Sequence, residues 1–504
     1  MSKIFLGKGE QDVHLLAKYG NRHGLIAGAT GTGKSVSLMV LAEGFSRLGV
    51  PVFLADVKGD LAGLSQPSVA NEKLNARLQR LAIGDYQSAA NPVVFWDIYG
   101  VNGHPVRTTV SELGPNLLTR LLELNDTQEG VLQVVFKVAD ENGMLLLDLD
   151  DLRAMLNFVA QNAKEISAKY GLVAPASVAA IQRALLQLDN AGGASFFGEP
   201  ALALADFMRQ DLNGRGIINV LAAEQLILKP RVYSSFLLWM LSELFENLPE
   251  IGDPEVPKLV FFFDEAHLLF ADAPASLKQR VEQVVRLIRS KGVGVYFISQ
   301  LPDDLPEVIL GQLGNRLQHA LRAFTPRDQK AVKTAAETFP PNPHFKVAEV
   351  ITQLGVGEAL VSTLQEGGIP LPVEKTYMAP PRCRIGAITA EERSTIRARS
   401  PIGGKYDTAV NRDSAYERLQ QRAASVAPTS SGPAAALPKA NPPERDPAPA
   451  DPGWGDKIKG FLFGTARRQG ALEAFAKSAV RNAGSRVSNQ ILRGVLGGVS
   501  GRRR

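Results

Sequence analysis

The sequence predicts an α/β fold with a central, mostly parallel β-sheet, a largely helical insertion and a separate C-terminal tail. Three observations lead to this prediction. Short apolar segments alternate with helical runs from residue 24 to about residue 110, and the alternation resumes after residue 212. Several of the short segments are apolar without interruption, which is typical of parallel strands covered by helices on both faces. Between these two stretches, apolar residues recur at helical spacing.

The first strand–helix–strand unit lies near the N-terminus. LIAG (25–28) is a short apolar strand, SVSLMVLAEGFSRLG is a helix, and PVFLADVKG (51–59) is a second strand. Because parallel strands must be joined by a crossover connection, this order predicts a βαβ unit. The helical insertion follows, with segments such as GVLQVVFKVADEN and SVAAIQRALLQLDNA.

The second half of the chain completes the predicted sheet. GIINVLAA, KLVFFFDE, GVGVYFIS and NRLQHALRAF (315–324) have the composition of strands, and helical runs lie between and after them. We therefore expect five parts: an N-terminal part of the sheet domain (1–110), a helical insertion (111–212), a C-terminal part of the sheet domain (213–400), a Pro/Ala-rich disordered linker (401–454) and a basic amphipathic tail (455–504).

Charge and cysteine content limit the possible function classes. The net charge is +5, but residues 455–504 contain eleven Lys/Arg and two Asp/Glu, so the rest of the chain is slightly acidic. The basic pI is therefore no evidence for a nucleic-acid-binding face on the main body. Cys383 is the single cysteine, which excludes an intrachain disulfide. The sequence shows no signal-peptide pattern and no apolar run of about 20 residues, so we expect a cytoplasmic protein without a transmembrane segment.

The turn after LIAG matches the phosphate-binding pattern G-x-x-x-x-G-K-[ST] without a mismatch. Its glycines let backbone N–H groups face a phosphate, and the following helix adds the positive end of its dipole. We expect Lys34 to bridge the β- and γ-phosphates of ATP and Ser35 to hold Mg²⁺ through its hydroxyl. The alternative, a chance glycine-rich turn, is disfavoured by the strand–turn–helix order. The expected nucleotide-binding residues are Gly28, Ala29, Thr30, Gly31, Thr32, Gly33, Lys34 and Ser35.

A second motif supplies two carboxylates. The apolar run LVFFF (259–263) ends in Asp264 and Glu265, and ligands of open α/β sheets bind at the carboxyl ends of the strands. We expect Asp264 to act on Mg²⁺ through its water shell, and Glu265 to orient and deprotonate the attacking water. By itself the pair is equally consistent with a solvated strand end. Together with the glycine-rich turn it predicts a RecA-like P-loop ATPase that uses ATP and Mg²⁺.

His267 completes a DEAH tetrapeptide, which is also found in two-lobed helicases. The chain shows no second RecA-like lobe with its own arginine-bearing helix. We therefore interpret His267 as a residue that flanks the end of the strand.

The segment RLIRSKGVGVYFISQLPDD (286–304) indicates which kind of ATPase this is. Gln300 ends a strand that should lie beside the Asp-Glu strand, where it can sense the γ-phosphate or position water. Arg289 ends the preceding helix, a position suited to reach a neighbouring subunit's nucleotide. Arg286 shares its helix face, and a solvated helix end is the favoured interpretation for it.

Four segments of the sequence resemble the HerA/FtsK superfamily of ring-forming DNA-pumping ATPases. They are GATGTGKS, FLADVKGDL, FFFDEAH, and IRSKGVGVYFISQLPDD followed by LGNRLQHAL. The chain is most similar to bacterial HerA-helicase-like proteins with a Pro-rich linker and a basic tail. The resemblance implies that Gln300 and Arg289 have the roles given above.

Further residues match the family in part. Asn315, Arg316 and Leu317 match the start of the family's next strand, and either Arg289 or Arg316 is the arginine that acts on the neighbour. Asp56 and Lys58 match an acidic-then-basic signature, for which an ion pair within the turn is the alternative. Because only about 23 residues precede the first strand, we expect neither the N-terminal β-barrel of HerA nor the membrane anchors of FtsK.

The resemblance implies a homo-oligomeric ring, expected to be a hexamer, that couples ATP hydrolysis to movement along double-stranded DNA as a translocase or helicase. A nuclease or another protein partner is a further expectation. The alternative is an oligomeric ATPase that remodels or scaffolds protein partners without pumping DNA. A nucleotide-binding switch without fast turnover is disfavoured by Glu265.

The tail contains apolar residues at helical spacing among basic ones. An oligomerisation helix, an interfacial amphipathic helix, a nonspecific nucleic-acid contact and a helix packed on the body all remain open.

Overall fold

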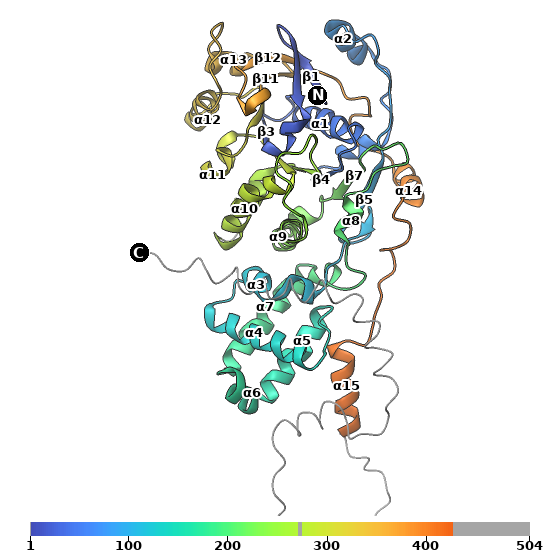
Figure 1. Cartoon of the computed structure of the whole chain (residues 1–504), viewed down its shortest axis with the longest axis vertical. Helices are drawn as coiled ribbons and strands as arrows, with labels where there is room; N and C mark the ends of the chain where they lie inside the picture. The colour runs from blue at the N-terminus through green and yellow to red at the C-terminus, as the bar shows by residue number, and fades with distance from the viewer. Residues whose placement is uncertain (1, 271–274, 427–504) are drawn as a thin grey trace, which may run out of the picture. The chain divides into compact units, whose positions relative to one another are not determined.

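The computed structural model describes residues 2–270 and 275–426. The tail and most of the linker expected from the sequence lie outside these residues. The described residues divide into two compact units, one formed by the residues up to Thr108 with Leu186–Val410, and one formed by Thr109–Leu185 with residues 411–426. The first unit contains the sheet, and the second is helical where it is described (Figure 1).

The described part of the first unit forms one twelve-stranded sheet with the order β2-β1-β12-β11-β10-β3-β9-β8-β4-β7-β5-β6. All neighbours from β10 to β6 are parallel, whereas β10–β11, β11–β12, β12–β1 and β1–β2 are antiparallel. The predicted mixed α/β fold with a mostly parallel sheet is therefore confirmed. The strands are β1 Lys3–Lys8, β2 Asp12–Leu16, β3 Gly24–Ala27, β4 Val52–Asp56, β5 Val93–Asp97, β6 His104–Pro105, β7 Ile218–Ala222, β8 Leu259–Phe263, β9 Val293–Ser299, β10 Asn315–Gln318, β11 Glu358–Ser362 and β12 Glu374–Met378.

The strand expected over 315–324 is shorter than its apolar pattern suggested. β10 ends at Gln318 because its parallel neighbour β3 ends at Ala27, opposite Gln318. The chain then leaves the sheet, and the carbonyl of Ala320 accepts a hydrogen bond from the N–H of Ala29. The end of β10 thus supports the turn that follows β3.

The helices of the first unit cover both faces of the sheet (Figure 1). The ring of Phe45 in α1 packs 6.4 Å from the ring of Phe262 in β8, whereas the ring of Phe53 in β4 packs 6.0 Å from that of Phe236 in α9. The ring of Phe261 in β8 lies 5.3 Å from that of Phe53. Since neighbouring residues of a strand face opposite sides, β8 is buried on both faces, as its apolar run predicted.

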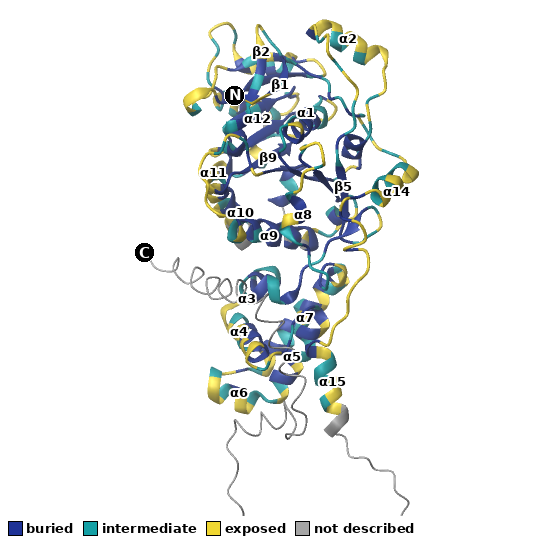
Figure 2. Cartoon of the chain, turned by 45° about the vertical axis from the view of Figure 1, so that its right-hand side comes forward, coloured by how far each residue is buried: buried dark blue, intermediate teal, exposed yellow. Residues whose placement is uncertain are grey.

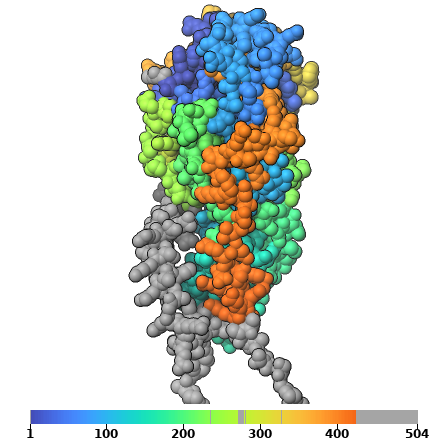
Figure 3. Space-filling model, turned by 90° about the vertical axis from the view of Figure 1, so that its right-hand side faces the viewer, coloured from blue at the N-terminus to red at the C-terminus, as the bar shows by residue number. Residues whose placement is uncertain are grey.

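The helices of the first unit differ in exposure. α2 exposes most of its length, while the strands between the helices are buried (Figure 2). The segment after β12, which includes α14, runs along one surface (orange in Figure 3). There Arg393 lies over the ring of Phe95 at 4.5 Å. The helices here are α1 Lys34–Arg47, α2 Glu72–Leu81, α8 Leu204–Phe207, α9 Pro230–Asn247, α10 Ala275–Ile288, α11 Glu307–Leu310, α12 Pro326–Glu337, α13 Val347–Gln353 and α14 Ala390–Ala398.

The second unit is built from α3 Val110–Leu121, α4 Asp126–Glu141, α5 Leu149–Gln161, α6 Ala163–Tyr170, most of α7 Pro175–Asn190 and α15 Ala415–Val426. α15 lies inside the range expected to be linker. It is held to the unit by the N–H of Tyr416, which donates to Asp151 at 2.9 Å. No single described helix is long and apolar enough to cross a membrane, although the bent pair α6–α7 meets that test jointly.

Candidate functional site

The glycine-rich turn connects β3 to α1 at the carboxyl edge of the sheet. A Cβ at Gly28 would lie 2.5 Å from the Cβ of His319, so only glycine fits there. Gly33 has a φ of 117°, a conformation that side chains disfavour. These two positions explain why the turn needs glycine where the backbone approaches β10 and where it enters the helix.

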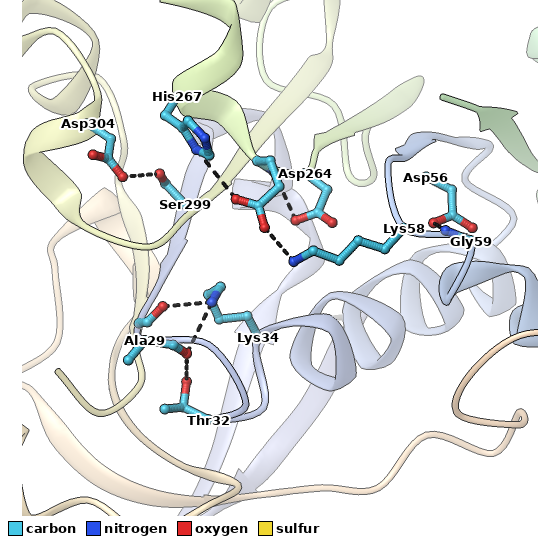
Figure 4. Close-up of polar contacts among 12 residues, drawn as sticks. Ala29, Thr32, Lys34, Asp56, Lys58, Gly59, Asp264, His267, Ser299 and Asp304 are labelled. Carbon is cyan, nitrogen blue, oxygen red and sulfur yellow. Dashed lines mark hydrogen bonds and ion pairs between the residues drawn. The ribbon is translucent and has the colours of Figure 1, made fainter. Parts of the chain in front are cut away.

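The N-terminus of α1 offers backbone donors to a ligand. Gly33 provides no side-chain cap, and the first N–H groups of a helix have no acceptor within it. Lys34 donates to the carbonyls of Gly28 and Ala29, at 2.7 and 3.2 Å, and burial lowers its pKa. Its ammonium therefore lies across the turn (Figure 4). Backbone donors, a helix dipole and a buried cation fit the phosphates of a nucleotide.

Asp264 and Glu265 follow the end of β8 and are both buried. One carboxylate oxygen of Asp264 accepts the N–H of Glu265 at 2.9 Å, while its Oδ2 is buried without a hydrogen-bond partner among the described residues. Burial and the charge of Glu265 raise the pKa of Asp264 to about 6. Among the described residues no cluster of three or more His, Cys, Asp or Glu forms a metal site. The unpaired oxygen of Asp264 fits a Mg²⁺ ion that takes most of its ligands from phosphates and water.

Glu265 is held by Lys58 and flanked by His267 (Figure 4). Burial opposes the ionisation of Glu265, but the hydrogen bond and the charge of Lys58 outweigh it, so its pKa lies below the usual value. His267 Nδ1 lies 3.4 Å from Oε2 of Glu265. His267 therefore flanks the strand end, in agreement with the interpretation of the DEAH tetrapeptide.

The ion pair considered for Asp56 and Lys58 is not formed. Asp56 instead accepts the N–H groups of Gly59 and Leu61, at 2.8 and 3.1 Å, which closes the turn after β4. Lys58 turns to Glu265 because β4 and β8 are neighbours in the sheet. Sequence reasoning missed this contact, since the neighbouring order of the strands is not readable from the motif.

Gln300 follows β9 and is exposed at the same edge as the glycine-rich turn. It lines an open pocket of about 340 Å³ together with Ala29 and Thr30. Asp304 fixes the local turn by accepting hydrogen bonds from the Ser299 hydroxyl, at 2.5 Å, and from the N–H of Leu301, at 3.0 Å. The structure thus brings Gln300 and the glycine-rich turn together, as a γ-phosphate sensor requires.

The arginines lie at the opposite, amino edge of the sheet. Arg289 precedes β9, and its Nη2 lies 3.5 Å from Asp253. Arg22, which sequence reasoning missed, precedes β3 and pairs with the same carboxylate. A pocket of about 510 Å³ is lined by Arg22, Arg286, Arg289 and Arg316. Arg289 is therefore not brought together with the glycine-rich turn of its own chain.

Arg316 is held by hydrogen bonds to backbone carbonyls, whereas the sequence left open whether it acts on a neighbouring subunit. Its guanidinium donates to the carbonyls of Leu310, Leu313 and Thr338, at 2.9, 3.0 and 2.9 Å, and burial lowers its pKa. These bonds hold the segments on either side of β10. Its side chain is thereby more constrained than that of Arg289, which is 42% exposed.

His319 is a second residue that the sequence did not single out. Its Nε2 lies 2.9 Å from the Ser37 hydroxyl of α1, and its Nδ1 lies 2.9 Å from the carbonyl of Glu358. Burial lowers its pKa to about 4, so the ring is neutral at pH 7. His319 braces the glycine-rich turn, and only its position directly after β10 could have indicated this.

Comparison with solved structures finds similar chains at low identity. The conjugative coupling protein TrwB is 16% identical with a TM-score of 0.47, covering 74% of this chain and 88% of that chain. VirB4 of Thermoanaerobacter pseudethanolicus is 17% identical with a TM-score of 0.46, covering 78% and 98%. TrwB has also been solved with ADP and Mg²⁺, and that structure is 16% identical with a TM-score of 0.47, covering 73% and 86%.

Sequence comparison gives the family. A protein of Methanocaldococcus jannaschii named as a probable helicase is 30% identical over 136 residues, which is 26% of this chain and 24% of the relative. The chain thus spans about a quarter of that relative's length. The family model for the helicase HerA-like C-terminal region matches residues 2–504. The resemblance seen in the motifs is confirmed, and the chain belongs to the HerA-like helicase C-terminal family.

Proposed function

We propose that the chain is an ATP-hydrolysing motor that works as a homo-oligomeric ring, a hexamer in the simplest case, and moves along double-stranded DNA. One observation carries the hydrolysis step. Asp264 and Glu265 directly follow β8. Their negative charges stabilise the Lys34 ammonium and partly offset the lowering of its pKa by burial. Phosphate-binding and water-activating groups therefore belong to one site.

The chain's own residues divide the chemistry between them. Lys34 would exchange its two carbonyl acceptors for the β- and γ-phosphates, and Mg²⁺ would be held by the Ser35 hydroxyl and, through its water shell, by Asp264. When bound, the metal offsets the negative charge that develops on the phosphates. Glu265 accepts a proton from the attacking water, and Gln300 orients that water or senses the γ-phosphate.

The proposed ring of subunits is supported by the position of the arginines. Arg289 and Arg22 lie at the amino edge of the sheet, whereas Gln300 and Lys34 lie at its carboxyl edge. An arginine that cannot reach its own nucleotide can stabilise the transition state in a neighbour. Arg289 is the better candidate because the guanidinium of Arg316 is engaged by three carbonyls.

DNA as the substrate is supported by the family and by the relative named as a probable helicase. The proposal also includes a cytoplasmic location and a nuclease or another protein as partner.

The test is ATPase activity with and without duplex DNA, on the full chain and on a version ending at residue 426. Stimulation that survives truncation supports a DNA motor whose body contacts DNA. Hydrolysis without stimulation in either version contradicts the DNA proposal and favours a motor that acts on protein partners. Absence of hydrolysis under all conditions contradicts the ATPase itself.

A further inference from the structure

Lys58 belongs to neither of the two nucleotide-binding motifs, yet it holds the carboxylate of Glu265. It follows the end of β4, which pairs in parallel with β8, the strand that leads to Glu265. The Lys58 side chain is 47% exposed and that of Glu265 is 6% exposed. A partly exposed cation thus reaches inward to a buried acid.

The charge balance of the site explains why such a cation is needed. Asp264 and Glu265 place two carboxylates next to each other in a buried position, where like charges repel strongly. Lys34 does not neutralise them through a hydrogen bond, because its ammonium donates to Gly28 and Ala29. When a nucleotide binds, Lys34 faces phosphates instead. Lys58 is then the side-chain cation left in direct contact with Glu265.

Hydrogen bonds fix the backbone turn that carries Lys58. Asp56 accepts the N–H groups of Gly59 and Leu61, and Gly59 adopts a φ of 75°. This positive φ is one that residues with a side chain disfavour, so the glycine and the two hydrogen bonds define the turn. The direction of the Lys58 side chain is therefore set by a fixed turn, which suits a residue that must hold another group in place.

The contact leaves one oxygen of Glu265 without a hydrogen bond among the described residues. Lys58 bonds to Oε1, whereas Oε2 has no hydrogen-bond partner among the described residues and lies 3.4 Å from His267 Nδ1. A carboxylate fixed through one oxygen presents the other in a defined direction. General bases work when their accepting atom is held toward the proton that they remove.

We propose that Lys58 is a positioning residue for ATP hydrolysis, which orients the Glu265 carboxylate so that it accepts the proton of the attacking water. This inference rests on the proposed ATPase function. In the step itself the water oxygen bonds to the γ-phosphorus, the bond to the bridging oxygen breaks, ADP leaves with that electron pair, and the proton passes to Glu265. In this step Lys58 acts through Glu265 and forms or breaks no bond.

The test is steady-state ATP hydrolysis by Lys58→Ala, Lys58→Arg and a matched control. Lys58→Ala should lower kcat at least about tenfold and change the KM for ATP less than about twofold, because ground-state binding is untouched. Lys58→Arg keeps the charge and the reach, and should recover most of the loss. Lys375→Ala is the control, since Lys375 is 45% exposed and lies 3.4 Å from a carboxylate oxygen of Glu358. It should leave kcat unchanged.

A double variant makes the assignment specific. If Lys58 acts through Glu265, adding Lys58→Ala to Glu265→Gln should cause no further loss of kcat. Additive losses, an unchanged kcat in Lys58→Ala, or a raised KM with normal kcat would each overturn the inference. Thermal unfolding shows whether each variant is folded. An inactive wild type would instead contradict the proposed ATPase, so the two failures are distinguishable.

Discussion

Arg22 and Arg289 share one carboxylate, that of Asp253. Nη2 of Arg22 lies 2.5 Å from Oδ2 of Asp253, and Nη2 of Arg289 lies 3.5 Å from Oδ1. Both arginines are partly exposed, and the two come from distant parts of the sequence. The pairing keeps two cations together at the edge of the sheet that lies away from the glycine-rich turn.

Arg289→Ala should abolish most ATPase activity while leaving nucleotide binding intact, because in the proposed ring this arginine acts on the neighbouring subunit. A loss of about a thousandfold is in the range for a transition-state arginine. Steady-state hydrolysis and binding of a fluorescent ATP analogue measure the two quantities. Arg286→Ala is the matched control, since Arg286 lines the same pocket and should change activity little.

Mixing subunits tests the direction of this effect. Rings that combine Arg289→Ala with Lys34→Ala subunits should regain activity, because an intact arginine then faces an intact glycine-rich turn at some interfaces. If mixed rings stay as inactive as their parents, an arginine acting between subunits is contradicted.

Glu265→Gln should lower kcat by about two to four orders of magnitude and keep the affinity for ATP, since only the proton acceptor is lost. Single-turnover hydrolysis and binding of a fluorescent ATP analogue measure the two effects separately. Unchanged turnover would instead favour a nucleotide-dependent switch over a motor.

His319→Ala should destabilise the chain and weaken nucleotide binding together. The change leaves the Ser37 hydroxyl and the Glu358 carbonyl without a partner in the buried space beside the glycine-rich turn, at a cost of about 1–3 kcal/mol for each group. Urea denaturation and nucleotide titration provide the measurements. His344→Ala, an exposed histidine, is the control and should change neither quantity.

The Asp56 carboxyl should give the stability of the nucleotide-free chain a downward contribution to its slope between pH about 4 and about 7. Burial and the charges of Asp60 and Glu224 raise the pKa of Asp56 to about 7 in the folded state. An acid with a raised folded pKa binds its proton more tightly when folded, so its contribution to stability is full below the unfolded pKa and is lost as the pH rises to the folded pKa. Asp56→Asn should reduce this slope in thermal melts between pH about 5 and about 8. An unchanged slope would show that Asp56 titrates normally.

The parts of the site that could be predicted are those in which one short segment contains the whole signal. The glycine-rich turn lies between an apolar strand and a helix, and Asp264 and Glu265 directly follow an apolar run. Gln300 was predictable because parallel strands end at the same edge of a sheet.

The contacts that could not be predicted join segments far apart in the sequence. Lys58 meets Glu265 because β4 pairs with β8, and His319 lies against Gly28 because β10 pairs with β3. Neither pairing follows the order of the strands along the chain. The antiparallel strands β1, β2, β11 and β12 were not predicted either, since Lys, Glu, Asp, His, Ser and Thr interrupt their apolar pattern.

The placement of the arginines at one edge of the sheet and of the glycine-rich turn at the other has a consequence for assembly. If Arg289 completes a neighbour's site, the amino edge of each subunit's sheet contacts one neighbour. The carboxyl edge, with the glycine-rich turn, contacts Arg289 of the other neighbour. Such a head-to-tail contact is heterologous, and it generates a closed ring or an open filament. Every active site is then composite, so one damaged subunit impairs two nucleotide sites, its own through Lys34 and the next one through Arg289.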